Sequence, residues 1–304
     1  MFKVNADLEK VCVKLNNPDK RLDHLEVSLM NPFRSHLCER VKGHISKISE
    51  EMNNKKFYIE TKYDGERCQL HKKGDKYKYF SRNIFDFTYD YGETVEEEGK
   101  FTSFFAKSLD PSVTDVIFDG EMCAWSIEHQ CLLCKSDQMN IRQIRPGDTK
   151  VQQCLVIYDV VYLNGEVLSK KPLKERIAIL EGIVKEQEGR VILGKRHVAE
   201  TLKEVVESLN LAIERREEGL VIKDMESTYK PGVRNKSGWI KIKPEYDDSL
   251  SDDLDLVILG GYYGSSGRNL GKVHQFLMGV SDGDKFLSIC RVSSGKGSLE
   301  FLRI

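Results

Sequence analysis

The sequence predicts an α+β protein in which antiparallel sheets are flanked by helices. Two observations support this class. Stretches in which apolar residues alternate, as in strands, lie beside stretches with helical spacing. Strands also group with strands instead of alternating strictly with helices, which argues against a doubly wound parallel sheet. A third observation is that only strands are expected after residue 253.

The elements expected in the first part of the chain follow from these periods. A first strand starts at Phe57 and runs towards a polar turn at 72–75. Further strands are expected at 76–81, 116–125, 154–163, 219–223 and 238–243. Helices are expected at 38–52, at 172–184 behind Pro172, and at 200–216.

The composition shifts at residues 247–253, an acidic and serine-rich run that reads as a domain junction. Short strands are expected after it at 254–262, 273–281 and 285–292. This is an all-β module, and the sequence stops before such a module closes into a barrel.

Charge and composition limit the class of protein. The 304 residues carry a net charge of -1 and are 40% hydrophobic, which fits a soluble protein of two domains. A nucleic-acid partner would need locally concentrated positive charge. No apolar run approaches the ~20 residues of a membrane span. No signal peptide is evident, so we expect a nuclear or cytosolic protein with reduced cysteines.

One cysteine pair has metal-ligand spacing. Cys131 and Cys134 form a CxxC, which Cys123 and Cys154 could complete. Without a second CxxC or a histidine pair, partly buried and inert cysteines are the expected reading.

The first chemical motif is Lys62-Tyr63-Asp64-Gly65. It places an amine at the end of a strand, on the same face as Glu60, and Asp-Gly favours a tight turn with positive φ. Alone, such a lysine is usually part of a solvated turn.

Carboxylates gather at other strand ends. Asp119 and Glu121 share one face after an apolar run, and Glu218 precedes Gly219 and the strand that ends at Lys223. Buried unpaired carboxylates are costly, so these positions favour a site over a core. The alternative is a solvated strand end.

A basic segment completes the set. Residues 229–243 contain five Lys or Arg and no acid, and Trp239, Lys241 and Lys243 share one face of a strand. An edge strand protected by lysines is the alternative. With the carboxylates, these cations fit phosphoryl or nucleotidyl transfer, with Mg²⁺ held by one or two carboxylates. Lys241, Lys243 and Arg67 are candidates for lowering the pKa of the nucleophilic lysine.

The order of these motifs resembles the covalent nucleotidyltransferases, and within them the ATP-dependent DNA ligases. The matching strings are KYDG with Arg67, FSRN at 80–83, DGE at 119–121, YDV at 158–160, EGLVIK at 218–223 and WIKIK at 239–243. Longer strings, including FYIETK at 57–62 and GGYYG at 260–264, resemble the DNA ligase IV subfamily of end joining.

The resemblance implies the site residues. Lys62 would attack the α-phosphate of ATP, and AMP would pass to the 5′-phosphate of a DNA break before a 3′-hydroxyl expels it. Glu60 would recognise adenine, and Glu121 and Glu218 would serve Mg²⁺. Tyr158 would stack on the base, and its buried hydroxyl would need a partner. The remaining nucleotide or phosphate contacts would be Thr61, Tyr63, Arg67, Arg82, Lys135, Lys223, Lys241 and Lys243.

The resemblance also implies a domain plan and partners. Residues 1–45 resemble the tail of a DNA-binding domain, 46–246 an adenylation domain, and 247–304 an incomplete OB-fold domain. The partner would be nicked or broken double-stranded DNA in the nucleus, and no membrane. The BRCT region that binds the subfamily's coiled-coil scaffold is missing, so that partner is not expected to bind. The family's last motif is also missing, which predicts weak sealing and impaired self-adenylation.

Two other readings stay open. An mRNA capping guanylyltransferase or an RNA ligase would share the KxDG motif and differ in nucleotide choice. A nucleotide- or DNA-binding fragment without turnover would keep the residues and lose the chemistry.

Overall fold

The computed structural model describes residues 16, 27–40, 45–52, 55–133, 140–144, 147–244, 255–264 and 271–293. The chain forms two compact units, Met1–Asp248 and Ser249–Ile304, which are described separately. The larger unit contains two sheets and the smaller unit one.

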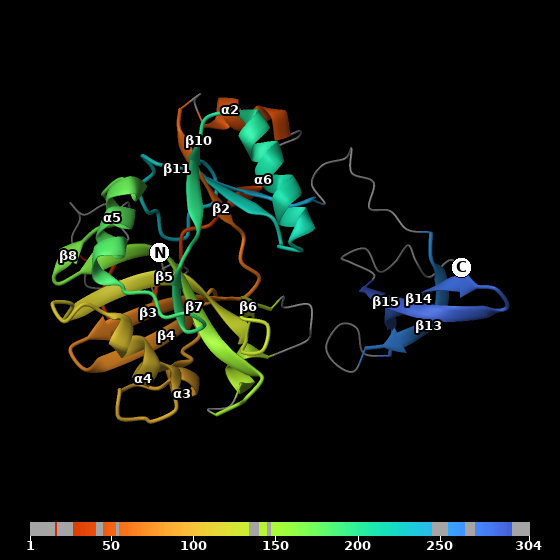
Figure 1. The fold of residues 1–304 in the computed structure, drawn as a ribbon, viewed down its shortest axis with the longest axis horizontal. Coiled ribbons are helices and arrows are strands. Elements are labelled where there is room, and N and C mark those ends of the chain that lie inside the picture. The colour runs from red at the N-terminus through yellow and green to blue at the C-terminus, as the bar shows by residue number, and fades with distance from the viewer. Residues whose placement is uncertain are drawn as a thin grey trace. The chain divides into compact units, whose positions relative to one another are not determined.

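The first sheet of the larger unit has five strands in the order β1-β12-β11-β2-β10. The pairing is antiparallel except between β1 and β12. Three helical segments pack on this sheet, namely α6, α2 and the short 3-10 helix η1 (Figure 1). The bounds are β1 Glu39–Arg40, η1 Ile45–Lys47, α2 Ile48–Glu51, β2 Phe57–Thr61, β10 Arg196–Ala199, α6 Leu202–Glu214, β11 Leu220–Asp224 and β12 Trp239–Ile242.

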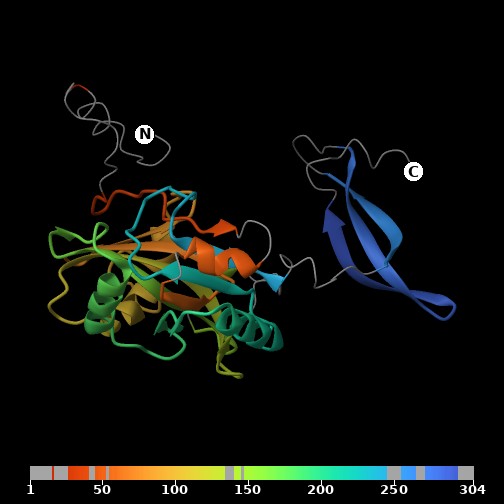
Figure 2. The same cartoon turned by 90° about the horizontal axis from the view of Figure 1, so that it is seen from above.

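The second sheet has seven strands, with the path β4-β3-β5-β7-β8 and with β6 and β9 joined to β5 and β7. Seen from above, the two long helices α5 (green) and α6 (teal) lie on the same side of the unit (Figure 2). The bounds are β3 Glu66–Lys73, β4 Lys76–Ser81, α3 Thr88–Tyr91, α4 Phe101–Phe105, η2 Ala106–Ser108, β5 Asp115–Ser126, β6 Cys131–Leu132, η4 Ile141–Gln143, β7 Val151–Leu163, β8 Glu166–Val167, α5 Leu173–Ile183 and β9 Val191–Leu193.

Each sheet has its own hydrophobic core. Ile59, Ile222 and Ile240 of the five-stranded sheet pack with Leu209 of α6. A second, larger cluster joins the seven-stranded sheet to α4 and α5. A smaller apolar cluster joins the two sheets, with Tyr158 of β7 packed against Val221 of β11 and Trp239 of β12.

The smaller unit is a three-stranded antiparallel sheet in chain order. Its strands are β13 Val257–Tyr263, β14 Val273–Asp282 and β15 Lys285–Ser293. These are the three strands expected from the sequence.

The α+β class is confirmed, as are the helices expected at 172–184 and 200–216, which form α5 and α6. The prediction of one helix over 38–52 was wrong. Glu39 and Arg40 instead form a strand that pairs in parallel with Ile240 and Lys241, and helical structure is limited to 45–51 in the described residues. The sheet edge offers backbone partners that helical spacing does not reveal.

The single strand expected from Phe57 to the turn at 72–75 is two strands in two sheets. β2 ends at Thr61, and β3 starts at Glu66 in the other sheet. The positive φ expected at Asp64-Gly65 was also wrong, because Gly65 is absent from the positive-φ residues. Gly65 is needed for space: a Cβ there would lie 2.4 Å from the backbone oxygen of Met122.

Three of the four cysteines with possible metal-ligand spacing lie in the described residues. Cys123 and Cys154 are buried while Cys131 is exposed, and Cys134 lies outside the described residues. Within the described ranges, no group of three metal-binding side chains occurs. No helix in the part of the chain that the structure describes has the length and apolarity to cross a bilayer.

His71 predicts a pH dependence of stability. The ring is fully buried, Nδ1 accepts the Met30 N–H at 2.9 Å, and burial lowers its pKa to about 3. The unfolded chain therefore takes up a proton below about 6.5 that the folded chain does not. This stability is present above pH 6.5 and is lost on acidification, by about 2 kcal/mol at pH 5. In urea unfolding, His71→Gln should lose less stability than wild type between pH 7 and 5. The exposed control His197→Gln should match wild type, and equal pH dependence in all three would refute this account.

Candidate active site

The segment Lys62–Gly65 crosses between the two sheets of the larger unit. It leaves β2 in the five-stranded sheet and enters β3 in the seven-stranded sheet. The Lys62 N–H donates to the Gly219 carbonyl at the start of β11, at 2.9 Å. The lysine thus lies where strands from both sheets meet.

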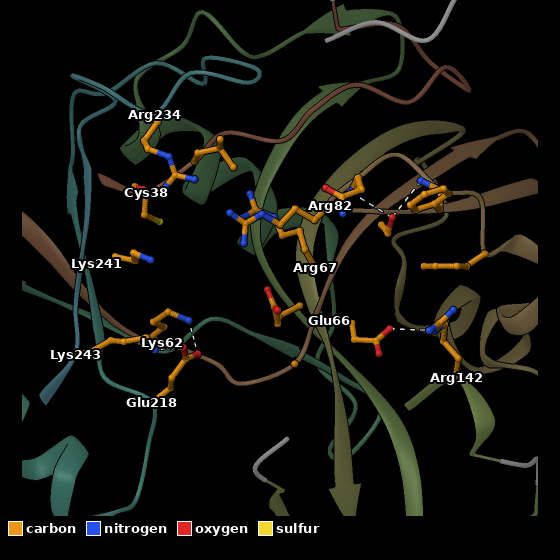
Figure 3. Close-up of a pocket in the computed structure, with 17 residues that line it drawn as sticks. Cys38, Lys62, Glu66, Arg67, Arg82, Arg142, Glu218, Arg234, Lys241 and Lys243 are labelled. Atoms are coloured by element: carbon orange, nitrogen blue, oxygen red, sulfur yellow. Dashed lines mark hydrogen bonds and ion pairs between the residues drawn. The ribbon is translucent and has the colours of Figure 1, made fainter. Parts of the chain in front are cut away.

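A cavity of about 500 Å³ opens beside this crossing (Figure 3). Seven Lys or Arg and three Glu line it, so its charge is positive although the chain as a whole is nearly neutral. The charged lining residues are Lys62, Glu66, Arg67, Arg82, Glu121, Arg142, Glu218, Arg234, Lys241 and Lys243. Such a cavity favours an anion of several charges, such as a nucleotide or a nucleic-acid backbone.

Lys62 is held by Glu218 at one end of the cavity (Figure 3). Its Nζ donates to Glu218 Oε2, and Lys243 Nζ lies 3.2 Å from Glu218 Oε1. Lys62 and Glu218 are each less than a quarter exposed. One carboxylate therefore orients two amines.

A smaller pocket of about 80 Å³ adjoins the cavity at Lys62, and both sheets contribute to it. Glu60 is buried in this pocket and accepts from Lys223 Nζ at 2.5 Å. Its other oxygen, Oε2, has Arg196 Nε at 3.6 Å and no hydrogen bond. A buried carboxylate oxygen without a hydrogen bond is an available acceptor.

Tyr158 forms one wall of the smaller pocket. Its hydroxyl donates to the Gly120 carbonyl at 3.2 Å, so the partner required by the buried hydroxyl is present. The ring packs at right angles to Trp239, with centroids 6.2 Å apart. Lys223 Nζ lies 4.5 Å from the ring centroid and the Arg67 guanidinium carbon 5.0 Å. Thr61 and Tyr63 also line this pocket.

Arg67 is largely buried and paired. Its guanidinium binds both carboxylate oxygens of Asp119 and donates to the His36 carbonyl at 3.1 Å. Tyr229 donates its hydroxyl to the same Asp119 at 2.6 Å. Sequence reasoning noted Asp119 as a strand-end carboxylate but left it out of the site, and it missed Tyr229. No pattern in the sequence links Tyr229 to Asp119.

Glu121 faces both the cavity and the smaller pocket. Burial raises its pKa to about 7, opposed by the positive charges of Arg67 and Lys62. Glu121 and Glu218 are two carboxylates at one cavity, which is the usual protein share of a Mg²⁺ site completed by phosphates and water. The donor set therefore fits Mg²⁺ brought with a nucleotide.

The remaining residues predicted for the site do not all lie in the same pocket. Arg82 is exposed, lines the cavity and makes no hydrogen bond or ion pair with the described residues. Lys241 lines the same cavity from β12, and Lys223 belongs to the smaller pocket. Lys135 lies outside the described residues.

Comparisons with known proteins identify the family to which this chain is similar. The family model for the ATP dependent DNA ligase domain matches residues 35–243. DNA ligase 4 of chicken, Gallus gallus, is 40% identical over 302 residues, and that of Homo sapiens 38%. Each comparison covers 97% of this chain and 32% of the relative. A solved structure, mycobacterial DNA ligase D complexed with ATP and MES, has a TM-score of 0.51 at 19% identity and covers 88% of this chain and 75% of that one.

The fold and the site thus define a domain of two sheets with a partly exposed lysine beside a cationic cavity. The chain belongs to the ATP-dependent DNA ligase domain family. It spans about a third of the length of the curated relatives it matches.

The ion pair of Arg67 and Asp119 allows a test of whether buried charge pairs hold the site together. Asp119→Asn leaves a buried guanidinium without its counter-charge, which should cost about 3–5 kcal/mol in urea unfolding. The double variant Arg67→Met with Asp119→Asn should recover part of that loss. Glu200→Gln is the control. It removes the exposed ion pair between Lys56 and Glu200 and should change the free energy of unfolding little. A small effect of Asp119→Asn on the free energy of unfolding would contradict the role of Asp119 as the counter-charge of Arg67.

Proposed function

We propose that this chain is the adenylating core of an ATP-dependent DNA ligase. Residues 46–246 form its adenylation domain and 247–304 part of an OB-fold domain, after a tail of a DNA-binding domain at 1–45. The observation that carries the proposal is the position of Lys62. Its amine is oriented by Glu218 at the joint between a cationic cavity and a base-sized recess walled by Tyr158.

In the first step, Lys62 Nζ attacks the α-phosphorus of ATP. The N–P bond forms while the bond from phosphorus to the bridging oxygen breaks, and pyrophosphate leaves with the electron pair. Lys62 must lose a proton before it attacks, and Glu218 Oε2 is the acceptor it already contacts. Lys241 and Lys243 line the cavity where phosphates would lie. They would stabilise the charge that develops there.

Mg²⁺, held by Glu121 and Glu218 with phosphate oxygens, would supply charge neutralisation during transfer. Glu121 has a second task in this proposal, since it lies between the cavity and the base pocket, beside Arg67. Both residues would then contact the ribose. Thr61, Tyr63 and Lys223 would complete the nucleotide contacts from the pocket walls.

In the next steps AMP passes from Lys62 to the 5′-phosphate of a DNA break, and the N–P bond breaks as a pyrophosphate linkage forms. A 3′-hydroxyl then attacks that 5′-phosphate and expels AMP, which joins the strands. Arg82, Lys135 and Arg234 would hold DNA phosphates. The relatives named DNA ligase 4 support end joining in the nucleus as the setting.

Glu60 supports the choice of ATP over GTP. The unbonded Oε2 would accept a hydrogen bond from the amino group of adenine, while the carbonyl oxygen of guanine would meet a like partial charge. Lys223 and Arg196 lie against the same carboxylate.

The first test is covalent labelling. Wild type incubated with Mg²⁺ and ATP labelled at the α-phosphate should retain acid-precipitable label, and Lys62→Ala should retain none. Thermal unfolding of Lys62→Ala should stay near wild type, because the side chain holds no part of either core. Label on Lys62→Ala would overturn the assignment of the nucleophile. Absence of label on a folded wild type would overturn the proposed first step.

A second test concerns the base. Glu60→Gln should lower the preference for ATP over GTP about tenfold or more, since a charge-assisted hydrogen bond is replaced by an amide that can also donate. Glu181→Gln is a matched control, because Glu181 contacts the other side of Arg196 and lines neither pocket. The ratio of labelling rates with the two nucleotides measures the effect. An unchanged ratio would make Glu60 only a structural partner of Lys223.

A further inference from the structure

One loop at the edge of the cationic cavity exposes an aromatic ring. Residues Ser81–Asp86 join β4 to α3, and Phe85 in this loop is 64% exposed while lining the cavity. Its ring makes no aromatic or cation contact with the described residues. Exposed large apolar residues occur elsewhere on the chain, but Phe85 shares its cavity with seven cations.

The loop is held in this shape by several hydrogen bonds. The Ser81 N–H donates to the Phe85 carbonyl at 2.9 Å, and the Ile84 N–H donates to the Ser81 carbonyl at 2.9 Å. The Ser81 hydroxyl oxygen accepts from the N–H groups of Asn83 and Phe85 at 3.3 and 3.1 Å. The position of Phe85 is therefore fixed by backbone bonds and not by packing of its ring.

Ile84 adds a second observation. Its φ is 62°, in the left-handed region that a β-branched residue rarely adopts. Strain of this kind persists where the surrounding structure enforces it, and it is commonest at binding sites. Here the strained residue turns the chain between Asn83 and Phe85, which both line the cavity.

The neighbouring ring of Phe87 shows the contrast. The Arg142 guanidinium carbon lies 4.3 Å from the Phe87 centroid, and Arg142 also pairs with Glu66 at 3.2 Å. Phe87 is thus engaged within the protein, and Phe85 is not. Phe85 also lies outside the smaller pocket around Tyr158, so it is not placed to contact the base of ATP.

We propose that Phe85 packs against the nucleotide that borders the DNA break, while Arg82 beside it binds a phosphate. This inference rests on the proposed function. A break exposes a base-pair face and a sugar that an intact duplex covers, and an aromatic ring on a rigid loop gains by stacking there. Phe85 would thereby favour broken over continuous DNA, whereas phosphate contacts alone do not distinguish them.

The test compares Phe85→Leu with Phe85→Trp, and uses Tyr89→Leu as the matched control. Tyr89 is 88% exposed and follows the same loop, but it does not line the cavity. Anisotropy titrations use one duplex with a phosphorylated nick and the same duplex without it. Phe85→Leu should weaken binding to nicked DNA about fivefold or more and change binding to the continuous duplex little. Phe85→Trp and Tyr89→Leu should stay within about twofold of wild type.

Two further readouts separate this inference from the function on which it rests. Phe85→Leu should keep the salt dependence of DNA binding, because no phosphate contact is lost, whereas Arg82→Gln should reduce its slope. Labelling of Lys62 by ATP should be unchanged in Phe85→Leu. Two outcomes would show that this inference is wrong, provided that wild type is labelled by ATP and binds nicked DNA. Phe85→Leu could bind nicked DNA as tightly as wild type, or its affinity for the nicked and the continuous duplex could fall by the same factor. If wild type neither labels nor binds DNA, the proposed function fails, and the role of Phe85 with it.

Discussion

The architecture of the site depends on buried charge pairs, one within each sheet of the larger unit. Each sheet buries an apolar face in its own core, and a smaller apolar cluster joins Tyr158 of one sheet to Val221 and Trp239 of the other. Arg67 with Asp119, and Glu60 with Lys223, are pairs in which both partners are largely or wholly buried. Such pairs add little net stability, but losing one partner is costly. Each pair joins neighbouring strands of one sheet and therefore fixes the position of its side chains, and Arg67, Glu60 and Lys223 line the pocket of Tyr158.

The position of Lys62, the nucleophile in our proposal, follows from the crossing between the two sheets. Lys62 ends one sheet and Glu66 starts the other, so the lysine belongs to neither core. It is instead held by the Gly219 carbonyl and the Glu218 carboxylate. The Glu218 carboxylate pairs with the amines of both Lys62 and Lys243, and Arg82 and Lys241 line the wall of the same cavity. A site built this way combines a rigid base pocket with a more open anion cavity.

Strand parity made much of this site predictable from the sequence. The face shared by Trp239, Lys241 and Lys243 is the face that meets the pockets, while Ile240 and Ile242 are buried in the core. Strand parity did not predict which buried side chains pair with one another. The bonds from Tyr229 and Arg67 to Asp119 join residues far apart in sequence, and no periodicity encodes them. Local propensity also failed at 38–52, where an open sheet edge pairs with Glu39 and Arg40. The motif glycine was noticed for its turn, whereas the structure requires it for close approach to Met122.

The four-residue crossing has a consequence for how such domains vary in length. One end is tied to β11 through Lys62, and the other packs against β5 at Gly65. An inserted or deleted residue there would shift the register of strands in both sheets at once and move the amine away from its carboxylate. Indels accumulated over evolution should instead collect in exposed connections such as 92–100, whose ends belong to one sheet and its helices. Alignments of distant members should therefore stay ungapped at this crossing even where little else is shared.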